Sequence, residues 1–193
     1  KGAQLSVQKL TKDLWEIECA NSTEVIVSYN YFANELNAGS TFLDEKQLHM
    51  NPVNCLLYDS DHVEASCELQ LNIPEDYQVA VALSSSAKNC FLAKNFDELA
   101  DSPFIASATL QHHSFDLEGT KFHLWFQGEF KPDWSLLEKD FIGFTKPQIE
   151  LFGDFPTKEY HYLFQILPQP AYHGVEHSAS TVILLGPSYN VLK

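Results

Sequence analysis

The amino-acid sequence predicts a mostly β fold, with a β-sandwich or saddle-like sheet in the N-terminal domain and an α/β segment after it. Many short runs of β-branched and aromatic residues, separated by turn residues, fill the first two-thirds of the chain. A long helical period then begins after Lys131-Pro132, and two strand patterns that are apolar on both faces follow it. With 45% hydrophobic and 20% charged residues, the 193-residue chain has the composition of a globular protein.

The first elements are predicted strands. Residues 7–18, VQKLTKDLWEIE, predict two short strands around a turn at residues 11–13. Residues 23–36, TEVIVSYNYFANEL, predict a long strand because β-branched and aromatic residues dominate them. Residues 65–73 alternate between apolar and polar side chains, which predicts a half-buried antiparallel strand, and residues 77–83 continue that pattern.

The middle of the chain combines a short helical turn with a hairpin. Residues 95–103, NFDELADSP, predict a turn of helix that ends before Pro103. Residues 104–128 predict further strands, with a hairpin turn at Glu118-Gly119. The N-terminal two-thirds is therefore expected to be β-rich.

The last third begins with a predicted helix. Asp133 is a suitable N-cap for residues 134–144, whose apolar side chains recur at helical intervals. Residues 145–153, TKPQIELFG, form either a second helix or a kinked continuation of the first, ending at Gly153. Residues 160–167 and 181–185 predict buried strands. We therefore expect residues 1–130 to form the β-rich N-terminal domain and residues 131–193 to open an α/β domain.

The charge of the chain restricts its partners. The sequence holds 26 acidic residues and 12 basic residues, and its net charge is -14. This balance argues against nucleic acid and anionic membranes as partners. No apolar run is long enough to cross a bilayer, and no signal peptide is visible, so we expect a cytoplasmic protein, or a periplasmic one if a signal peptide was removed. The four cysteines, Cys19, Cys55, Cys67 and Cys90, are widely spaced, and we interpret them as thiols; their even number also permits disulfides but does not require them.

Histidines are the first candidates for a metal site. His112, His113 and His123 lie on opposite arms of the predicted hairpin and could approach one another. Because no third and fourth ligand occurs at local spacing, we interpret them as partly exposed strand residues. His49 and His62 are predicted to be isolated loop residues.

The stretch QPAYHGVEHS, residues 169–178, allows three interpretations. His173, Glu176 and His177 match the H-x-x-E-H pattern of inverted zinc peptidases, which would need a helix, although nearby prolines and Gly174 disfavour one. An ordinary polar loop is the second interpretation. The third is an edge strand that binds a peptide, in which Glu176 holds the peptide's amino terminus by a charge-assisted hydrogen bond.

Several segments resemble the glycyl aminopeptidase family of H-E-x-x-H zinc peptidases, whose members typically carry a PDZ domain. A buried strand, then Gly174-Val175-Glu176-His177, then a second buried strand is similar to the family pattern. Four upstream segments match the family in the same order: VIVSYNYFANEL, HMNPVNCLLY, FDELADSP and ELFGDFP. His173 departs from the pattern, since many relatives have glycine there.

The resemblance implies a fold, a function and a set of site residues. Residues 131–193 would open a thermolysin-like catalytic domain, and Gly174, Val175, Glu176 and His177 would bind substrate, with Glu176 as the anchor of the peptide amine. The zinc ligands and the general base would follow Lys193, so this chain would hold no catalytic residue and no metal ligand, and it would be inactive alone.

The implied partners are the amino terminus of a peptide and the remainder of the catalytic domain, with zinc bound in the full-length parent. Such an enzyme would release N-terminal residues of the glycine or alanine type. The alternative function is a free-standing β-sandwich binding module without catalysis.

Overall fold

The computed structural model describes residues 4–19 and 22–187, and it contains two compact units, Lys1–Phe32 and Ala33–Lys193. The described residues form fourteen strands in four sheets and few helices, which confirms the mostly β prediction. None of their helices combines the length and the apolarity that a membrane crossing requires. All four cysteines carry thiols rather than disulfides.

The first unit contains a small hairpin. Strands β1 (Val7–Lys9) and β2 (Trp15–Ile17) pair antiparallel, as predicted. In the turn between them, the hydroxyl of Thr11 donates a hydrogen bond of 2.7 Å to the carboxylate of Asp13. This short side-chain bond is typical of turns and explains why the sequence signal was reliable here.

The long strand predicted at residues 23–36 is wrong. Within the described part of this segment, only Asn34 forms a β-bridge, with Phe42. Ile26 is 81% exposed and Phe32 is 86% exposed, whereas a half-buried strand would bury part of its apolar side chains. The β-propensity of a side chain measures its fit to a half-buried sheet, and it does not supply the partner strand that a sheet needs.

The second unit contains two smaller sheets, and all of their strand pairs are antiparallel. The four-stranded sheet has the order β3 (Phe42–Leu43), β4 (Gln47–Met50), β9 (Phe104–Ser107) and β6 (Gln78–Val81). The three-stranded sheet has the order β5 (Cys67–Gln70), β8 (Cys90–Ala93) and β7 (Ser84–Ala87). The predicted alternation of residues 65–73 is confirmed, since Cys67, Leu69, Leu71 and Ile73 are partly buried between exposed neighbours.

Two short helices lie beside these sheets: the 3-10 turn η1 (Pro52–Asn54) and helix α1 (Phe96–Ala100). The Asn95 side chain caps α1 by accepting a hydrogen bond of 3.0 Å from the amide of Glu98. Helix α1 ends at Ala100, shortly before Pro103, as the sequence predicts.

The largest sheet has five strands in the order β10 (Gln111–Leu117), β11 (Thr120–Gln127), β12 (Glu159–Ile166), β14 (Ser180–Leu185) and β13 (Tyr172–Glu176). Strands β11, β12 and β14 are parallel, while β10 and β13 at the two edges run antiparallel to their neighbours. The β10–β11 hairpin turns at Glu118 and Gly119, both with positive φ, which confirms its predicted position.

One continuous helix, α2 (Trp134–Phe152), connects β11 to β12. The side chain of Asp133 caps its start, and Gly153, with φ 101°, ends it, as predicted. Of the two alternatives for residues 145–153, a second helix or a continuation of the first, the structure shows the continuation, because the helix runs through Pro147 without a break.

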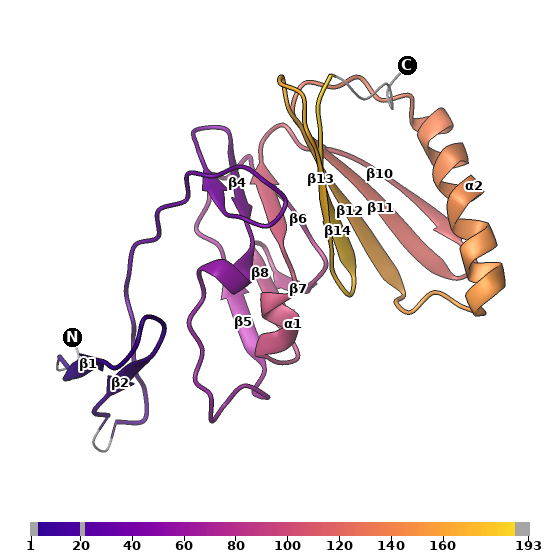
Figure 1. The fold of residues 1–193 in the computed structure, drawn as a ribbon. Coiled ribbons are helices and arrows are strands. Elements are labelled where there is room, and N and C mark those ends of the chain that lie inside the picture. Colours follow the sequence, from indigo (N-terminus) through magenta and orange to yellow (C-terminus); the bar gives the residue numbers. More distant parts are fainter. Residues whose placement is uncertain (1–3, 20–21, 188–193) are drawn as a thin grey trace. The chain divides into compact units, whose positions relative to one another are not determined.

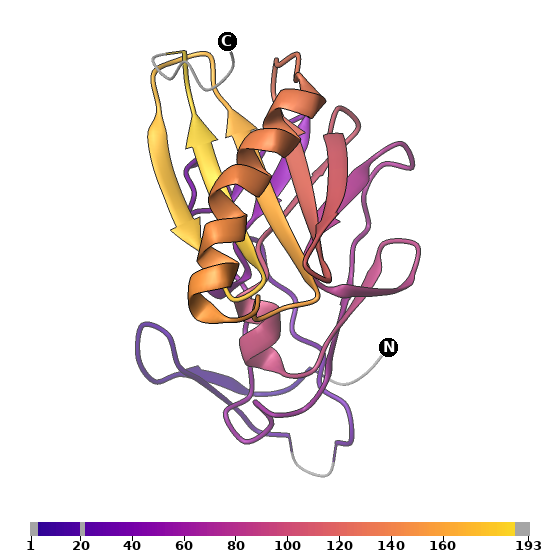
Figure 2. The same ribbon diagram turned by 90° about the vertical axis from the view of Figure 1, so that its right-hand side faces the viewer.

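The five-stranded sheet is buried on both faces. Figures 1 and 2 show α2 crossing one face, where Leu137 and Phe141 pack against a cluster that includes Phe122 and Phe164. On the opposite face, Leu163 and Val182 join residues of the four-stranded sheet in a second cluster, Ala80 and Ile105 among them. The domain division near residue 130 stays a prediction; β10 and β11 precede that position and belong to the same sheet as β12.

Candidate functional site

The candidate peptide-binding segment is the edge strand β13 (Figure 1). It pairs only with β14, with Gly174 opposite Ile183 and Glu176 opposite Thr181. Within residues 4–19 and 22–187, no strand pairs with its other edge, so this edge is in a position to accept an additional strand. The sequence-based interpretation of this stretch as an edge strand is therefore confirmed, and the polar-loop interpretation is wrong.

The inverted zinc site at His173, Glu176 and His177 is also wrong. That pattern needs a helix, in which residues four apart lie on the same face, but His173 and Glu176 lie on a strand and His177 directly follows it. Four residues of extended chain span about 13 Å, so the two histidines cannot share one metal ion. The ring of His177 is instead bonded to Asp101.

The predicted substrate-binding residues have different surroundings. Gly174 and Glu176 are exposed on β13, while Val175 is partly buried against the core between the two sheets. The His177 side chain is only 7% exposed. These residues are close because they are consecutive, but Glu176 and Val175 point to opposite faces of the sheet.

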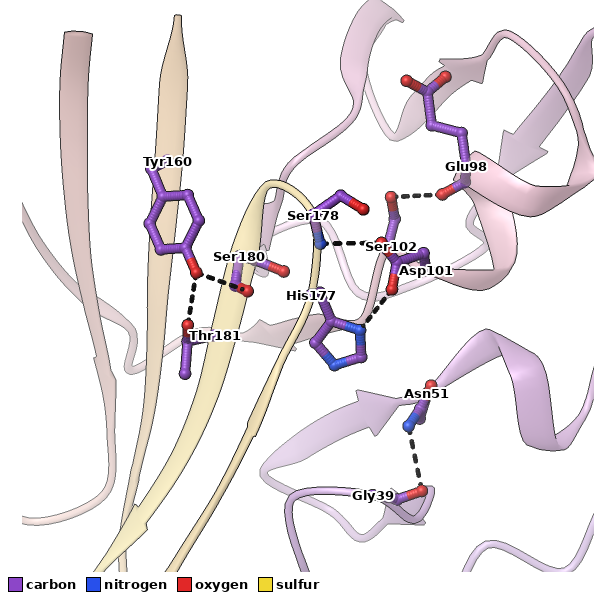
Figure 3. A network of polar contacts seen from close by, with 10 residues as sticks. All are labelled: Gly39, Asn51, Glu98, Asp101, Ser102, Tyr160, His177, Ser178, Ser180 and Thr181. Carbon is purple, nitrogen blue, oxygen red and sulfur yellow. Dashed lines mark hydrogen bonds and ion pairs between the residues drawn. The ribbon is translucent and has the colours of Figure 1, made fainter. Parts of the chain in front are cut away.

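Glu176 lies beside a hydroxyl network on the face that carries α2. Figure 3 shows the hydroxyl of Tyr160 in contact with Thr181 and Ser180. It lies 2.6 Å from Thr181 Oγ1 and 3.0 Å from the carbonyl oxygen of Ser180. Burial raises the pKa of Tyr160, and the negative charges of Glu176 and Asp101 act in the same direction. Among the described residues, no cation lies within ion-pair distance of the Glu176 carboxylate, so that charge is available to a ligand.

Asp101 fixes the turn that follows β13, and the sequence analysis did not identify it. One carboxylate oxygen accepts a hydrogen bond of 2.9 Å from Nδ1 of His177, and the other accepts one of 2.9 Å from the amide of Ser178 (Figure 3). Burial alone would raise the pKa of Asp101, but the hydrogen bonds from Ser178 and His177 outweigh it and hold the pKa below its usual value. Asp101 directly follows α1, so this contact joins two segments that are 76 residues apart.

Replacing Asp101 tests this anchor. Asp101→Asn keeps the size of the side chain but removes the charge that strengthens both hydrogen bonds. We expect a loss of about 1 kcal/mol in the free energy of unfolding, since the carboxylate is partly exposed. Amide hydrogen exchange at Ser178 should become faster. Asp154→Asn, in an exposed loop, is the matched control; equal exchange at Ser178 in both variants would contradict the anchoring role.

His49 lies in a strand and not in a loop, so its prediction as a loop residue is wrong. It belongs to β4 and is fully buried. Burial lowers the pKa of His49 to about 4, the nearby backbone groups of Asn37 and Phe104 act against that shift, and the charge of His177 adds to it. His49 is thus neutral at physiological pH.

A second group of histidines lies on the five-stranded sheet. As the sequence suggests, the two hairpin arms bring His112 and His123 together, with His112 Nε2 3.0 Å from His123 Nδ1. The structure adds His161 of β12, whose ring stacks on that of His123 at 4.4 Å. Burial lowers the pKa of His112 to about 4, that of His161 to about 3, and that of His123 as well. His113 points elsewhere, to Glu138 of α2.

Known structures include one that matches nearly the whole chain. An aminopeptidase N family protein from Idiomarina loihiensis is 26% identical, with a TM-score of 0.80 over 95% of this chain. The match covers 32% of that protein, so this chain spans about a third of its length. An M1 zinc metallopeptidase from Deinococcus radiodurans, 12% identical over 78% of this chain and 39% of its own, has a TM-score of 0.48, too low to support an inference. No curated protein sequence matches the chain.

The family assignment comes from the N-terminal part of the sequence. The model of the peptidase M61 N-terminal domain matches residues 1–108. This region contains both smaller sheets, helix α1 and the Asp101 anchor. Since the match extends over more than half of the 193 residues, the chain belongs to the peptidase M61 N-terminal domain family.

Proposed function

We propose that this chain is the N-terminal, substrate-binding part of a zinc metallo-aminopeptidase. In this proposal a peptide adds to the outer edge of β13 as a further strand, and Glu176 holds its amino terminus. The observation that carries the proposal is the exposed edge of β13, which ends in a carboxylate without an ion pair among the described residues.

In this proposal, backbone pairing would supply affinity for peptides of varied sequence. An added strand exchanges main-chain hydrogen bonds with the edge, and these bonds do not depend on the peptide's side chains. A Cβ atom at Gly174 would meet no neighbour nearer than 3.4 Å, so the packing of the chain does not itself require glycine there. The missing side chain instead lets the backbone of a bound peptide approach the strand closely. We infer that Gly174 and Val175 contribute backbone contacts.

In this proposal, charge would supply the preference for an amino terminus. The carboxylate of Glu176 can accept a charge-assisted hydrogen bond from a peptide ammonium, which is stronger than a neutral one. The net charge of -14 attracts a cationic terminus further. Asp101 takes no part in this contact; it binds His177 and Ser178 and so holds the turn directly after Glu176.

The finer assignment rests on the sequence resemblance together with the family match. We propose that the parent enzyme is a glycyl aminopeptidase that releases N-terminal glycine or alanine and carries a PDZ domain. The solved protein from Idiomarina loihiensis, named an aminopeptidase N family protein, supports an aminopeptidase. Residues 131–193 would then open the catalytic domain, and the remainder of that domain is the expected partner.

The residues of β13 do not fit a catalytic zinc ion. His173 and His177 are separated along an extended strand, and Nδ1 of His177 is bonded to Asp101. The sequence also contains no H-E-x-x-H motif. The residues described above therefore bind and orient a peptide, and we assign them no step in the chemistry.

Titration of the isotopically labelled chain with a short peptide that begins with glycine tests the proposal. We expect amide shifts in β13, largest near Gly174 and Glu176, and none in the edge strand β10. Shifts confined to β10, or none at saturating peptide, would contradict it. A parallel assay with glycyl and alanyl chromogenic substrates should give no turnover, since this chain supplies binding residues; zinc-dependent turnover by the chain alone would contradict that assignment.

A further inference from the structure

The histidine cluster on the five-stranded sheet has the composition of a metal site. His123, Glu159 and His161 each offer one ligand atom, and these atoms all lie within 4.8 Å of one another. His123 and His161 occupy paired positions on the parallel strands β11 and β12, and Glu159 lies two residues before His161 on the same face. The three side chains therefore converge because of strand register, with no motif in the sequence.

One nitrogen of His123 is unsatisfied. Its Nε2 atom is buried and makes no hydrogen bond within the described structure, and the carboxylate of Glu159 lies 3.7 Å away. A buried polar atom without a partner costs free energy, so such an atom beside a carboxylate and a second imidazole calls for an explanation. A bound cation supplies one, because it would bind the nitrogen lone pair and the carboxylate together.

The surroundings orient His123 for such a role. Its Nδ1 atom lies 3.0 Å from Nε2 of His112, and the His112 ring stacks on Trp125 at 3.7 Å. When Nδ1–H of His123 donates to His112, the lone pair of His123 Nε2 is free to bind a metal. Metal-binding histidines generally donate their second ring nitrogen to a neighbouring acceptor in this way.

We propose that His123, Glu159 and His161 form a binding site for a divalent first-row transition metal of the zinc type. Two imidazoles and one carboxylate are a ligand set for zinc and related ions, and three protein ligands leave one position for water. Ligand atoms around a tetrahedral zinc ion lie about 3.3–3.5 Å apart, which follows from the bond lengths of zinc to nitrogen and oxygen. The ligand atoms here are separated by up to 4.8 Å, so metal binding would require small rotations of the stacked His123 and His161 rings and of the Glu159 side chain, which is 63% exposed.

The site differs from the peptide-binding edge in its position. His123 and Glu159 share the face of Leu163, which packs on the four-stranded sheet, whereas Glu176 lies opposite Thr181 on the face of α2. Loss of metal binding and loss of peptide binding can therefore be measured separately, and this proposal does not depend on the proposed function.

Metal binding should also change the environment of Trp125. Its indole N–H donates a hydrogen bond of 3.2 Å to Nδ1 of His161, so neutral His161 carries its hydrogen on Nε2. A metal on Nε2 requires that hydrogen to move to Nδ1, which can then no longer accept the hydrogen bond from Trp125. The fluorescence of Trp125 should therefore report metal binding. Because binding costs the hydrogen bond between Trp125 and His161, we expect a moderate affinity for the metal.

The experiment uses the chain without a histidine tag, freed of metal by a chelator. Calorimetric titration with Zn²⁺ and Co²⁺ should show one ion per chain, and Trp125 emission should change in step in a Trp15→Phe/Trp134→Phe background. His123→Gln and Glu159→Gln should each weaken binding by at least about 10-fold, and His112→Gln by about 10-fold. His113→Gln and His62→Gln, whose rings contact Glu138 and Asp59, are matched controls that should bind normally.

Absence of stoichiometric binding by the unmodified chain would overturn the proposal. Unchanged affinity in both His123→Gln and Glu159→Gln would also overturn it, because the metal would then bind elsewhere. Since Glu159 is exposed, its replacement should not disturb folding, so the proposal can still be tested if His123→Gln is unstable.

Discussion

Gly186→Ala is expected to unfold the edge strand, with a loss of about 3 kcal/mol or more in the free energy of unfolding. A Cβ atom at Gly186 would overlap the carbonyl oxygen of Gln169 and lie 2.5 Å from the amide nitrogen of Ala171. Both are backbone atoms, so no side-chain rotation relieves the overlap. The amide of Gly186 also donates a hydrogen bond of 3.1 Å to the carbonyl of Ala171, directly before β13.

Chemical denaturation and amide exchange measure this effect, and Gly143→Ala is the matched control. Gly143 lies exposed in α2, and apart from the neighbouring helix backbone no atom lies within 4 Å of an added Cβ. Alanine there should increase stability by about 0.5–1 kcal/mol because it lowers the entropy of the unfolded chain and favours the helix. If Gly186→Ala were as stable as the unmodified chain, the close packing of residues 169–171 against Gly186 would be incorrect.

Acidification is expected to destabilise the protein through His49. Its pKa is about 4 in the folded state and about 6.5 when the chain is unfolded. Between these values the unfolded state binds the proton more readily, so stability is complete above about pH 6.5 and falls as the pH decreases toward 4. The loss from this residue is on the order of 3 kcal/mol.

The thermal midpoint, measured from pH 7.5 to pH 4.5, isolates this contribution. His112 and His161 also have lowered pKa values and contribute to the loss of stability in the same pH range. The quantity to compare between variants is therefore the slope of the thermal midpoint against pH. His49→Gln should flatten the dependence on pH, whatever its stability at pH 7.5. His62→Gln, in an exposed loop, should leave the slope unchanged. An equal slope for His49→Gln and the unmodified chain would show that His49 is not buried as described.

Local signals in the sequence predicted local structure well. The Thr11–Asp13 turn, the Glu118-Gly119 hairpin, the Asp133 cap and the Gly153 end of α2 all depend on residues a few positions apart. The strand predicted at residues 23–36 failed because pairing requires a partner, and propensity contains no information about one. The continuation of α2 through Pro147 could not be decided, since the cost of proline depends on the packing around it.

The candidate site shows the same difference between features with a local sequence signal and features that depend on long-range pairing. The extended character of β13 follows from Pro168 and Pro170, which precede it, and from Gly174 within it, and it was predicted. The Asp101 anchor and the ligands on β12 were not, because they depend on long-range pairing: Asp101 meets His177 across 76 residues, and parallel register places His161 beside His123. A parallel connection through α2 separates these partners in the sequence, so no local spacing can reveal them.

The affinity of the chain for a glycine-initiated peptide, compared with the same peptide acetylated at its amino terminus, tests the central claim most directly. Acetylation removes the ammonium and should weaken binding to the unmodified chain by roughly 10- to 100-fold, which corresponds to about 1.5–3 kcal/mol for a charge-assisted hydrogen bond. In Glu176→Gln that difference should disappear, while Glu150→Gln, on an exposed position of α2, should retain it. If Glu176→Gln still preferred the free amine by the full factor, Glu176 would not hold the peptide's amino terminus.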